Sequence, residues 1–345
     1  MNVNLAWLAA LEFVVMCYSA LYDDGCRVSS VIFSENMKTK QIVLFPLLLM
    51  FASCSFNAGN AKKDSVQTKN TAAAKVTDSA PKGKGQTDEK MTLTIDGVDF
   101  TFVKVKGGSF YMGSQKDDPH GINYDPQSDT DDCIVHKVTL SDYWIGETEI
   151  TQKQWKKIVV IDSEGLKPDR KSGWGDNYPM YYLAWIQCMD YAKKLSKIAH
   201  EEKLIKDNQT FSLPTDAQWE YAARGGVKSK HYRYSGSNDV NEVAWNYINA
   251  DGKVHPVATK KPNELGIYDM SGNVSEWCSD SYRKYGKEES VNPRFPYDNV
   301  IRLGNLVVLR WGNVDTDISY LRVSSRIGDD PGWCEDFYGF RLVLQ

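Results

Sequence analysis

The sequence lacks the common signatures of metal and nucleotide chemistry. Its seven cysteines form no CxxC pair and no zinc spacing. No two of its five histidines share HxxxH spacing, so a histidine-rich iron or zinc site is not expected. There is also no P-loop, no GxSxG and no GxGxxG after a strand. These absences argue against the common nucleotide-binding enzymes, serine hydrolases and zinc proteins.

Positive charge is not in excess either. The chain has 41 Lys and Arg against 45 Asp and Glu, a net charge of −4, so no basic face for phosphate contacts is expected and nucleic acid is not an expected partner. Aromatic residues are plentiful, with 19 tyrosines and 10 tryptophans. Aromatics without helical periodicity indicate a loop-rich compact domain or a binding surface for extended ligands.

The region from Met37 has the pattern of a bacterial export signal. MKTKQIVLFPLLLMFASCSF places two lysines before a short apolar run and small residues. The ending FASC resembles a lipobox, which predicts a signal peptide over 37–53, cleavage before Cys54 and diacylation of its thiol. The alternative is an ordinary signal peptide with Cys54 incidental. The first prediction places the protein in the cell envelope, anchored in a membrane on the periplasmic or outer-membrane side.

The flanking segments follow from this prediction. Residues 1–36 precede a complete signal, which is best explained by a start codon assigned too early, or else by a first apolar anchor around 5–21. Residues 54–90 have almost no large apolar side chain and are predicted to be a flexible tether. The remaining residues, 91–345, have the length of one domain.

Periodicity within 91–345 predicts an α+β domain. Alternating residues from Met91 indicate a hairpin of strands, followed by a strand in SFYMGS, a polar loop over 115–132 and strand-like HKVTLSDYWIGETEI. Capping boxes predict helices after Thr151 and Thr215, and helical spacing of apolar residues predicts a helix over 184–198. From residue 231 onward, short strands and loops are expected.

The stretch GIYDMSGNVSEWCSD is the strongest candidate for a site. The side chains of Asp269 and Glu276 and the carbonyls of Gly272 and Val274 form a set of hard oxygen ligands that suits calcium. The EF-hand pattern is absent, and a turn with solvated acids is the alternative.

Other charged residues and cysteines have structural interpretations. Glu147 and Glu149 are interpreted as polar positions around a strand. Cys188 is predicted to be a buried free thiol, and a Cys278–Cys334 bridge is permitted by an exported location. The arginines of 310–326 are predicted to form an ion-pair lattice that ties loops together, in preference to an anion site, with the nearby acids Asp315, Asp317, Asp329 and Asp330.

Five stretches, taken in order, resemble one family. The sequences GGSFYMGS, VTLSDYWIGETEITQKQW, FSLPTDAQWEYAARGG, PNELGIYDMSGNVSEWCSD and RVSSR…DDPGW…YGFRLVL are similar to motifs of the formylglycine-generating enzyme, or sulfatase-modifying factor, family. The resemblance covers Val98 to Leu344. It implies a single α+β domain of low regular secondary structure, related to C-type lectins.

The resemblance also implies a calcium ion at Asp269, Gly272, Val274 and Glu276. Ser275 stands where the family usually has tryptophan, which alters packing beside this loop. The family's second calcium site falls in the region matching 243–257, where the ligands are not recognisable.

Catalysis in the family uses copper held by two cysteines in the C-terminal segment. Residues 305–333 contain no cysteine, and Cys278 and Cys334 flank the region outside the matching positions. Copper binding and formylglycine generation are therefore not expected, and no catalytic or cofactor-binding residue is assigned.

Two functions remain after this comparison. Some family members are nonheme-iron sulfoxide synthases, whose histidine ligands lie in an additional helical domain not seen in this sequence, or pigment-maturation oxidases. Others are lipoproteins of the gliding and type IX secretion machinery of Bacteroidetes-type bacteria, and the anchor, tether and missing cysteines here are similar to that group. The first hypothesis is a noncatalytic scaffold that binds an envelope protein or glycan. The alternative is an oxidoreductase with another metal site, acting on a protein or small molecule between Trp311 and Trp333.

Overall fold

A computed structural model of the chain describes residues 90–159, 172–297 and 305–345. The predicted signal, Cys54 and the tether lie outside these residues. Within this part of the chain, no helix has the length and apolar character needed to cross a membrane. The description below concerns the unit that ends at Gln345.

The predicted opening hairpin is confirmed. Strand β1 (Lys90–Ile95) pairs antiparallel with β2 (Val98–Val105), and Ile95 lies opposite Val98. Asp96 and Gly97, the two residues between the strands, both have positive φ, at 45° and 77°. An Asp-Gly pair accepts this conformation readily, which explains why the chain reverses here.

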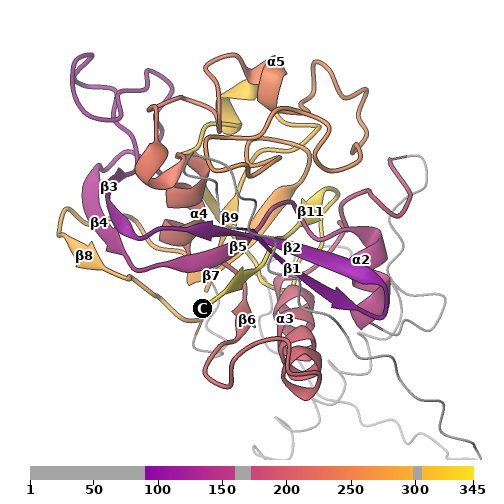
Figure 1. The fold of residues 1–345 in the computed structure, drawn as a ribbon. Helices are drawn as coiled ribbons and strands as arrows, with labels where there is room; N and C mark the ends of the chain where they lie inside the picture. Colours follow the sequence, from indigo (N-terminus) through magenta and orange to yellow (C-terminus); the bar gives the residue numbers. More distant parts are fainter. Residues whose placement is uncertain (1–89, 160–171, 298–304) are drawn as a thin grey trace, which may run out of the picture. The chain divides into compact units, whose positions relative to one another are not determined.

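The strands form three sheets (Figure 1). The five-stranded sheet has the order β1-β2-β5-β12-β6, the four-stranded sheet has the order β10-β9-β7-β11, and β3-β4-β8 form the third. Apart from β1 and β2, the strands are β3 (Gly108–Met112), β4 (His136–Leu140), β5 (Tyr143–Gly146), β6 (Phe211–Ser212), β7 (Ser275–Ser281), β8 (Ser290–Val291), β9 (Val307–Arg310), β10 (Ile327–Asp329), β11 (Tyr338–Gly339) and β12 (Val343–Leu344).

The helices begin where the capping residues predict. Thr151 and Thr215 each accept a hydrogen bond from the residue three positions on, and each capping box is complete. The longest helix extends the predicted one by a turn at its end and buries Cys188, Tyr191 and Leu195. The α-helices are α2 (Gln152–Ile158), α3 (Trp185–Glu201), α4 (Asp216–Ala223) and α5 (Val240–Val243). There are also two short 3-10 helices in the described residues, η1 (Gly226–Lys228) and η2 (Ile318–Tyr320).

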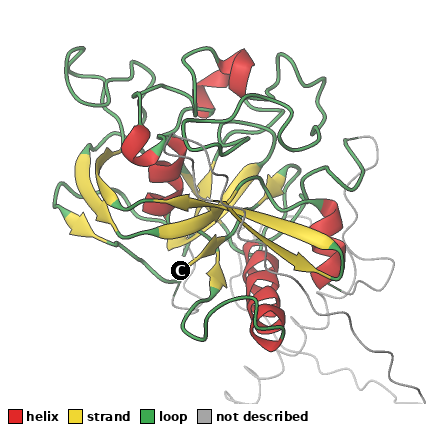
Figure 2. Cartoon of the chain, in the orientation of Figure 1, coloured by secondary structure: helices red, strands yellow, loops and turns green. Residues whose placement is uncertain are grey.

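The helices pack on the sheets and leave a large loop-rich region. α3 contacts β6 and β7, while α4 contacts β3 and β7, so α4 lies between the third sheet and the four-stranded sheet. All eight residues of α4 are buried, including its charged ones. Figure 2 shows that loops and turns make up most of the region around α5. The α+β class with little regular structure is thus confirmed.

Candidate functional site

The loop that precedes β7 makes a tight turn. Asp269 and Asn273 have φ values of 60° and 64°, in the left-handed region. At Gly272, an added Cβ would collide with the backbone oxygen of Trp245, so the turn packs too closely for a larger residue. This geometry brings the predicted calcium ligands into the interior, where both carboxylates are buried.

Glu276 is already bound by other side chains. Its carboxylate accepts hydrogen bonds from Arg341, at 2.7 Å from Nε to Oε2 and 2.8 Å from Nη2 to Oε1. The indole Nε1 of Trp219 donates to Oε2 at 2.8 Å. Such a two-pronged contact between fully buried groups is a strong, charge-assisted interaction. A cation at Glu276 would therefore lie next to the positive charge of Arg341.

Asp269 and Glu149 keep oxygens without partners. Asp269 Oδ2 accepts from the backbone N–H of Ala258 at 2.7 Å, but Oδ1 has no hydrogen bond among the described residues. Glu149 is fully buried, and its Oε1 likewise has no partner there. Burial raises the pKa of Asp269 to about 6. Burial, and then the charge of Asp269, raises the pKa of Glu149 well above its ordinary value.

Glu149, Asp269, Glu276 and Arg341 form what we call the acid cluster. A calcium ion fits this cluster in part: Asp269 offers a free buried oxygen, and Glu149 offers a second, whereas the oxygens of Glu276 are occupied. No group of three or more His, Cys, Asp or Glu side chains in the described chain is arranged to hold a metal ion. The four-residue calcium site stays a prediction.

Sequence reasoning missed Glu149. It was interpreted as a polar position around a strand, like Glu147. The structure separates the two: Glu147 is only partly buried and pairs with Lys90 at 2.6 Å, while Glu149 points into the interior. No local sequence pattern distinguishes Glu149 from Glu147; the burial of Glu149, next to the buried residues Ile150 and Thr151, is seen only in the structure.

A second buried ionic group lies around α4. Asp216, Glu220, Arg310 and Arg326 form what we call the arginine cluster. Arg310 Nη1 donates to Glu220 Oε2 at 3.0 Å and Arg310 also pairs with Asp216, while Arg326 Nε lies 3.0 Å from Asp216 Oδ2. The ring of Trp219 lies between the two clusters, since its indole N–H donates to Glu276 and the Arg310 guanidinium lies 5.1 Å from its centroid.

The third arginine ties down the loop after β3. Arg322 pairs with Asp132 at 2.6 Å, with Asp129 at 3.2 Å and with Asp125 at 3.6 Å. The predicted lattice of internal ion pairs is therefore present, but its acids come from 125–132 and 216–220. The prediction that Asp315, Asp317, Asp329 and Asp330 pair with these arginines was wrong. Those aspartates are near the arginines in the sequence, whereas folding brings the acids of 125–132 and 216–220 close to them.

Ser275, the first residue of β7, is hydrogen-bonded to Gly312 and Asn313 of the C-terminal segment. Its hydroxyl accepts hydrogen bonds from Gly312 N at 3.3 Å and Asn313 Nδ2 at 3.0 Å. Ser275 is fully buried and Asn313 nearly so. A side chain as small as serine leaves room for this contact, which a tryptophan at the same position would fill.

Three of the described cysteines are free thiols. Cys188 and Cys278 are free and buried, and burial raises the pKa of both thiols well above the ordinary value. The buried thiol predicted at Cys188 is thus confirmed. Because Cys278 is free, the permitted Cys278–Cys334 bridge is not formed. Cys133 is free and exposed.

The alternative hypothesis placed a site between Trp311 and Trp333. Trp311 stacks on Tyr320 with ring centroids 4.8 Å apart, and Trp333 is 58 % exposed. Neither tryptophan lines the pocket beside β12 or the groove next to the loop after β3, the two cavities described below.

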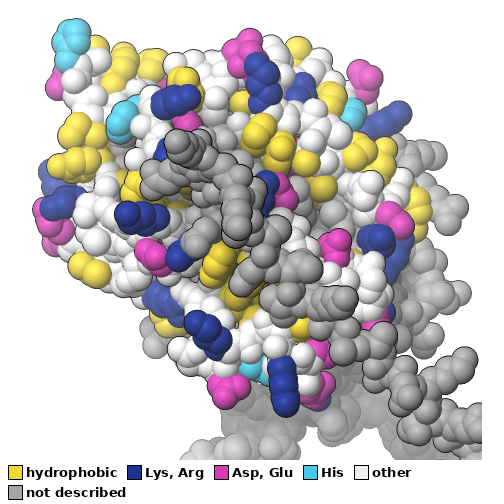
Figure 3. Space-filling model, viewed as in Figure 1, with side chains coloured by type: hydrophobic (Ala, Val, Ile, Leu, Met, Phe, Trp, Pro, Cys, Tyr) yellow, Lys and Arg dark blue, Asp and Glu magenta, His cyan; other side chains and the backbone are white. Residues whose placement is uncertain are grey.

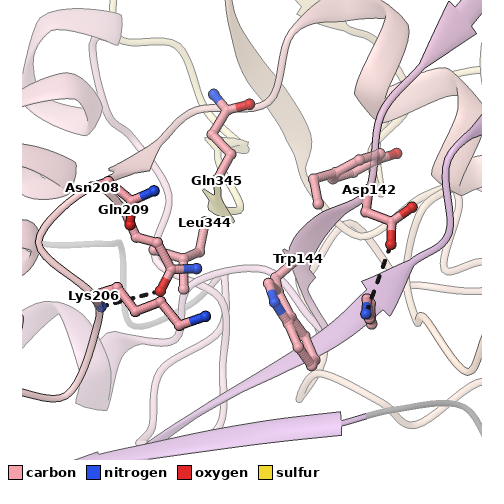
Figure 4. Close-up of a pocket in the computed structure, with 9 residues that line it drawn as sticks. Asp142, Trp144, Lys206, Asn208, Gln209, Leu344 and Gln345 are labelled. Atoms are coloured by element: carbon pink, nitrogen blue, oxygen red, sulfur yellow. Dashed lines mark hydrogen bonds and ion pairs between the residues drawn. The ribbon is translucent and has the colours of Figure 1, made fainter.

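One small pocket lies beside β12. It has a volume of about 220 Å³, and Figure 4 shows Trp144 on one side, facing Lys206, Gln209 and Gln345. Lys206 N–H donates to Gln209 Oε1 at 3.1 Å. Its lining includes no cysteine, serine or histidine, and one of its two lysines, Lys104, pairs with Asp142 at 3.7 Å.

A larger groove lies between the loop after β3, residues 231–238 and the pair Val323–Ser324. Its volume is about 560 Å³. We call it the loop groove; it is lined by Ser114, Pro119, Gly121, Ile122, Asn123, Tyr124, Asp125, Pro126, Arg224, His231, Tyr232, Arg233, Asn238, Val323 and Ser324. This is a size typical of ligand pockets.

Comparison with known proteins agrees with these features. Residues 97–345 match the model of the sulfatase-modifying factor enzyme 1-like domain. A formylglycine-generating enzyme of Streptomyces coelicolor is 26 % identical over 302 residues, covering 70 % of this chain and 88 % of that protein. The chaperone protein LppX of Paenibacillus barcinonensis is 36 % identical over 183 residues, covering 41 % of this chain. This chain spans only 63 % of that chaperone's length.

A solved structure shows the same arrangement. Variable protein 1 of Treponema denticola superposes with a TM-score of 0.58 and is 27 % identical, covering 74 % of this chain and 98 % of that one. The similarity extends over nearly the whole of that protein, so it concerns the complete domain and not a shared fragment.

Proposed function

Because this chain belongs to the sulfatase-modifying factor enzyme 1-like family, we propose that it is a noncatalytic member that acts as a lipid-anchored binding domain of the cell envelope. The observation that carries the proposal is the absence of cysteine from residues 305–333. The partner is an envelope protein or glycan, in a role like that of the gliding and type IX secretion lipoproteins.

The state of the thiols supports a noncatalytic role. A soft metal such as copper requires paired thiolates. Cys188 and Cys278 are held as neutral thiols by burial, and Cys133 is exposed, with Thr130 O 3.7 Å from its Sγ. These three cysteines supply no thiolate pair.

The packing of the C-terminal segment supports the same conclusion. Asn313 is held by Ser275, and Arg310 and Arg326 are held by the acids of α4. Buried side chains that are held in ion pairs and hydrogen bonds of this kind brace a fold, which supports a structural role for this segment.

The anchor is proposed from the sequence alone. Two lysines, an apolar run and the ending FASC support cleavage before Cys54, and the polar tether supports a domain held at some distance from the membrane. The name of the Paenibacillus relative, a chaperone, is compatible with a role in binding another protein or polymer.

We further propose that calcium, when bound, braces the acid cluster. Asp269 and Glu149 would hold it through their free oxygens, with carbonyls of the 269–276 loop. The ion would supply positive charge to buried carboxylates and would have a structural role only.

Mass spectrometry tests the noncatalytic proposal. The processed full chain is incubated with copper and a peptide containing Cys-x-Pro-x-Arg, with the Streptomyces coelicolor enzyme as positive control. We expect an unchanged peptide mass with this chain and conversion with the control. Conversion by this chain would overturn the proposal in favour of a family oxidoreductase.

The anchor is tested by the intact mass of membrane-extracted protein. Wild-type protein should start at residue 54 and carry added lipid mass. Cys54→Ser should be released into the soluble fraction without that mass. A wild-type protein free of lipid would remove the anchor from the proposal.

A further inference from the structure

The loop groove combines an aromatic rim with a fixed polar floor. Tyr124 and Ile122 line it and are 40 % and 51 % exposed, so each presents apolar surface to a ligand. Tyr232 is half-buried in the same lining. In Figure 3, hydrophobic side chains gather over the loop after β3, at the upper left. Exposed rings beside a cavity favour a ligand with a flat apolar face.

Arg233, one of the residues that line the groove, has a buried N–H group without a hydrogen-bond partner among the described residues. Arg233 Nη2 donates to Gln127 Oε1 at 2.7 Å and also to Asp125, which fixes the guanidinium. Its Nε is buried and makes no hydrogen bond within the described residues. A buried N–H without a partner is costly, so a ligand acceptor that reaches it gains that free energy back.

The charges around the groove are balanced. Arg233 pairs with Asp125, Arg224 pairs with Glu220 at 2.8 Å, and Arg322 below them pairs with Asp132. No arginine charge is left to attract a phosphate or an acidic peptide. The balance favours an uncharged ligand.

Several backbone groups of the loop after β3 are already hydrogen-bonded within the loop. Tyr124 N–H donates to Gly121 O, Asp125 N–H donates to Gln115 O at 2.8 Å, and Gln115 N–H donates to Asn123 O at 3.1 Å. A peptide that binds by adding a strand needs free N–H and C=O groups along one edge. This groove therefore recognises a ligand through side chains.

We propose that the loop groove binds a neutral oligosaccharide, a proposal that rests on the binding role proposed above and names its ligand class. A pyranose ring has an apolar C–H face that packs on an aromatic ring. Its hydroxyls can accept a hydrogen bond from Arg233 Nε, the lining group that has no hydrogen bond within the described residues. A cavity of about 560 Å³ accommodates part of an oligosaccharide chain.

Isothermal titration of the processed full chain tests this proposal. The probes are maltohexaose, cellohexaose, xylohexaose and mannohexaose, with a proline-rich decapeptide as a ligand of another class. We expect at least one oligosaccharide to bind, Tyr124→Ala to weaken that binding about tenfold, and Tyr124→Phe to keep it, because the ring face carries the contact.

Tyr247→Ala is the matched control, since Tyr247 is 51 % exposed and lies outside the groove lining. It should bind like the wild type, and unchanged melting temperatures should show that all variants fold. The proposal is overturned if none of the four oligosaccharides binds, if Tyr124→Ala and Tyr247→Ala behave alike, or if the decapeptide binds through Tyr124. Those outcomes leave the noncatalytic proposal standing, because only peptide-cysteine conversion removes it.

Discussion

The arginine cluster and the acid cluster are equally buried but differ in charge balance. Around α4, Arg310 and Arg326 face Asp216 and Glu220, so each negative charge has a positive one. In the acid cluster, Glu149, Asp269 and Glu276 share the single cation Arg341. Burial alone therefore does not mark a metal site. The informative feature is an excess of buried carboxylates, which must be neutralised by protons or by a bound cation.

Removing an arginine from the balanced cluster should have the largest effect. Arg310→Met leaves Glu220 and Asp216 with less compensation in the interior, which typically costs about 3–5 kcal/mol. Chemical denaturation at neutral pH measures the free energy of unfolding. Arg294→Met is the control, because Arg294 is exposed and its loss should cost less than about 0.5 kcal/mol. Equal effects of the two substitutions would show that the cluster is not a unit of stability.

Stability should fall with rising pH because of Asp280, which lies beside the arginine cluster. Burial raises the pKa of Asp280 to about 6, from the ordinary 3.8 of the unfolded chain. The folded state therefore binds the proton more tightly. Its contribution, about 3 kcal/mol at most, is present below about pH 4 and is lost as the pH rises through 6.

Asp280→Asn should flatten this dependence. Denaturation between pH 4 and 7, with calcium chelated, measures it. Burial also raises the pKa of Asp269 to about 6, so a residual slope in Asp280→Asn should disappear when Asp269→Asn is added. An unchanged slope in both variants would mean that these carboxyls are not buried as described.

Calcium should stabilise the acid cluster and leave the arginine cluster unaffected. At a hundredfold excess over Kd, binding to the folded state adds about 2.7 kcal/mol, seen as a rise in melting temperature. Glu149→Gln should abolish that rise because it removes a charged ligand, and it should change the melting temperature in chelator little, because burial already disfavours the charged form of Glu149.

Glu276→Gln distinguishes two possible calcium ligand sets: the proposed one, which uses Asp269 and Glu149, and the one expected from the sequence, which uses Asp269 and Glu276. It should lower the melting temperature by weakening the pair with Arg341, yet keep most of the calcium response. Loss of the response in Glu276→Gln but not in Glu149→Gln would favour the ligand set expected from the sequence. No response in the wild type would remove calcium from this site.

Local structure was largely predictable from the sequence. The opening hairpin and the capping boxes at Thr151 and Thr215 depend on residues close to each other in the sequence, and the structure confirms them. The family motifs likewise predicted the α+β class. In each case the determining contacts are short in sequence.

Partners across the fold were not predictable. Arg310 contacts Asp216 from 94 positions away, and Arg322 contacts Asp132 from 190. The charge of a residue does not indicate which acid the fold places beside it, so the partners of these arginines could not be predicted. The burial of Glu149 was not predictable for a related reason. The segment after β5 contacts residues more than 100 positions away, with Tyr268 N–H donating to Glu147 O and Asn273 Nδ2 to Glu149 Oε2, and no local pattern records such contacts.

The position of β12 has a consequence for how the protein is made. Val343 pairs with Ile145 of β5 on one side and Ser212 of β6 on the other. The five-stranded sheet is thus joined by the strand that the ribosome makes after every other described strand. Sheet closure must wait until residue 343 has emerged, and such long-range pairing is slow. Until β12 has been made, the edges of β5 and β6 that face each other across its place stay without a strand between them.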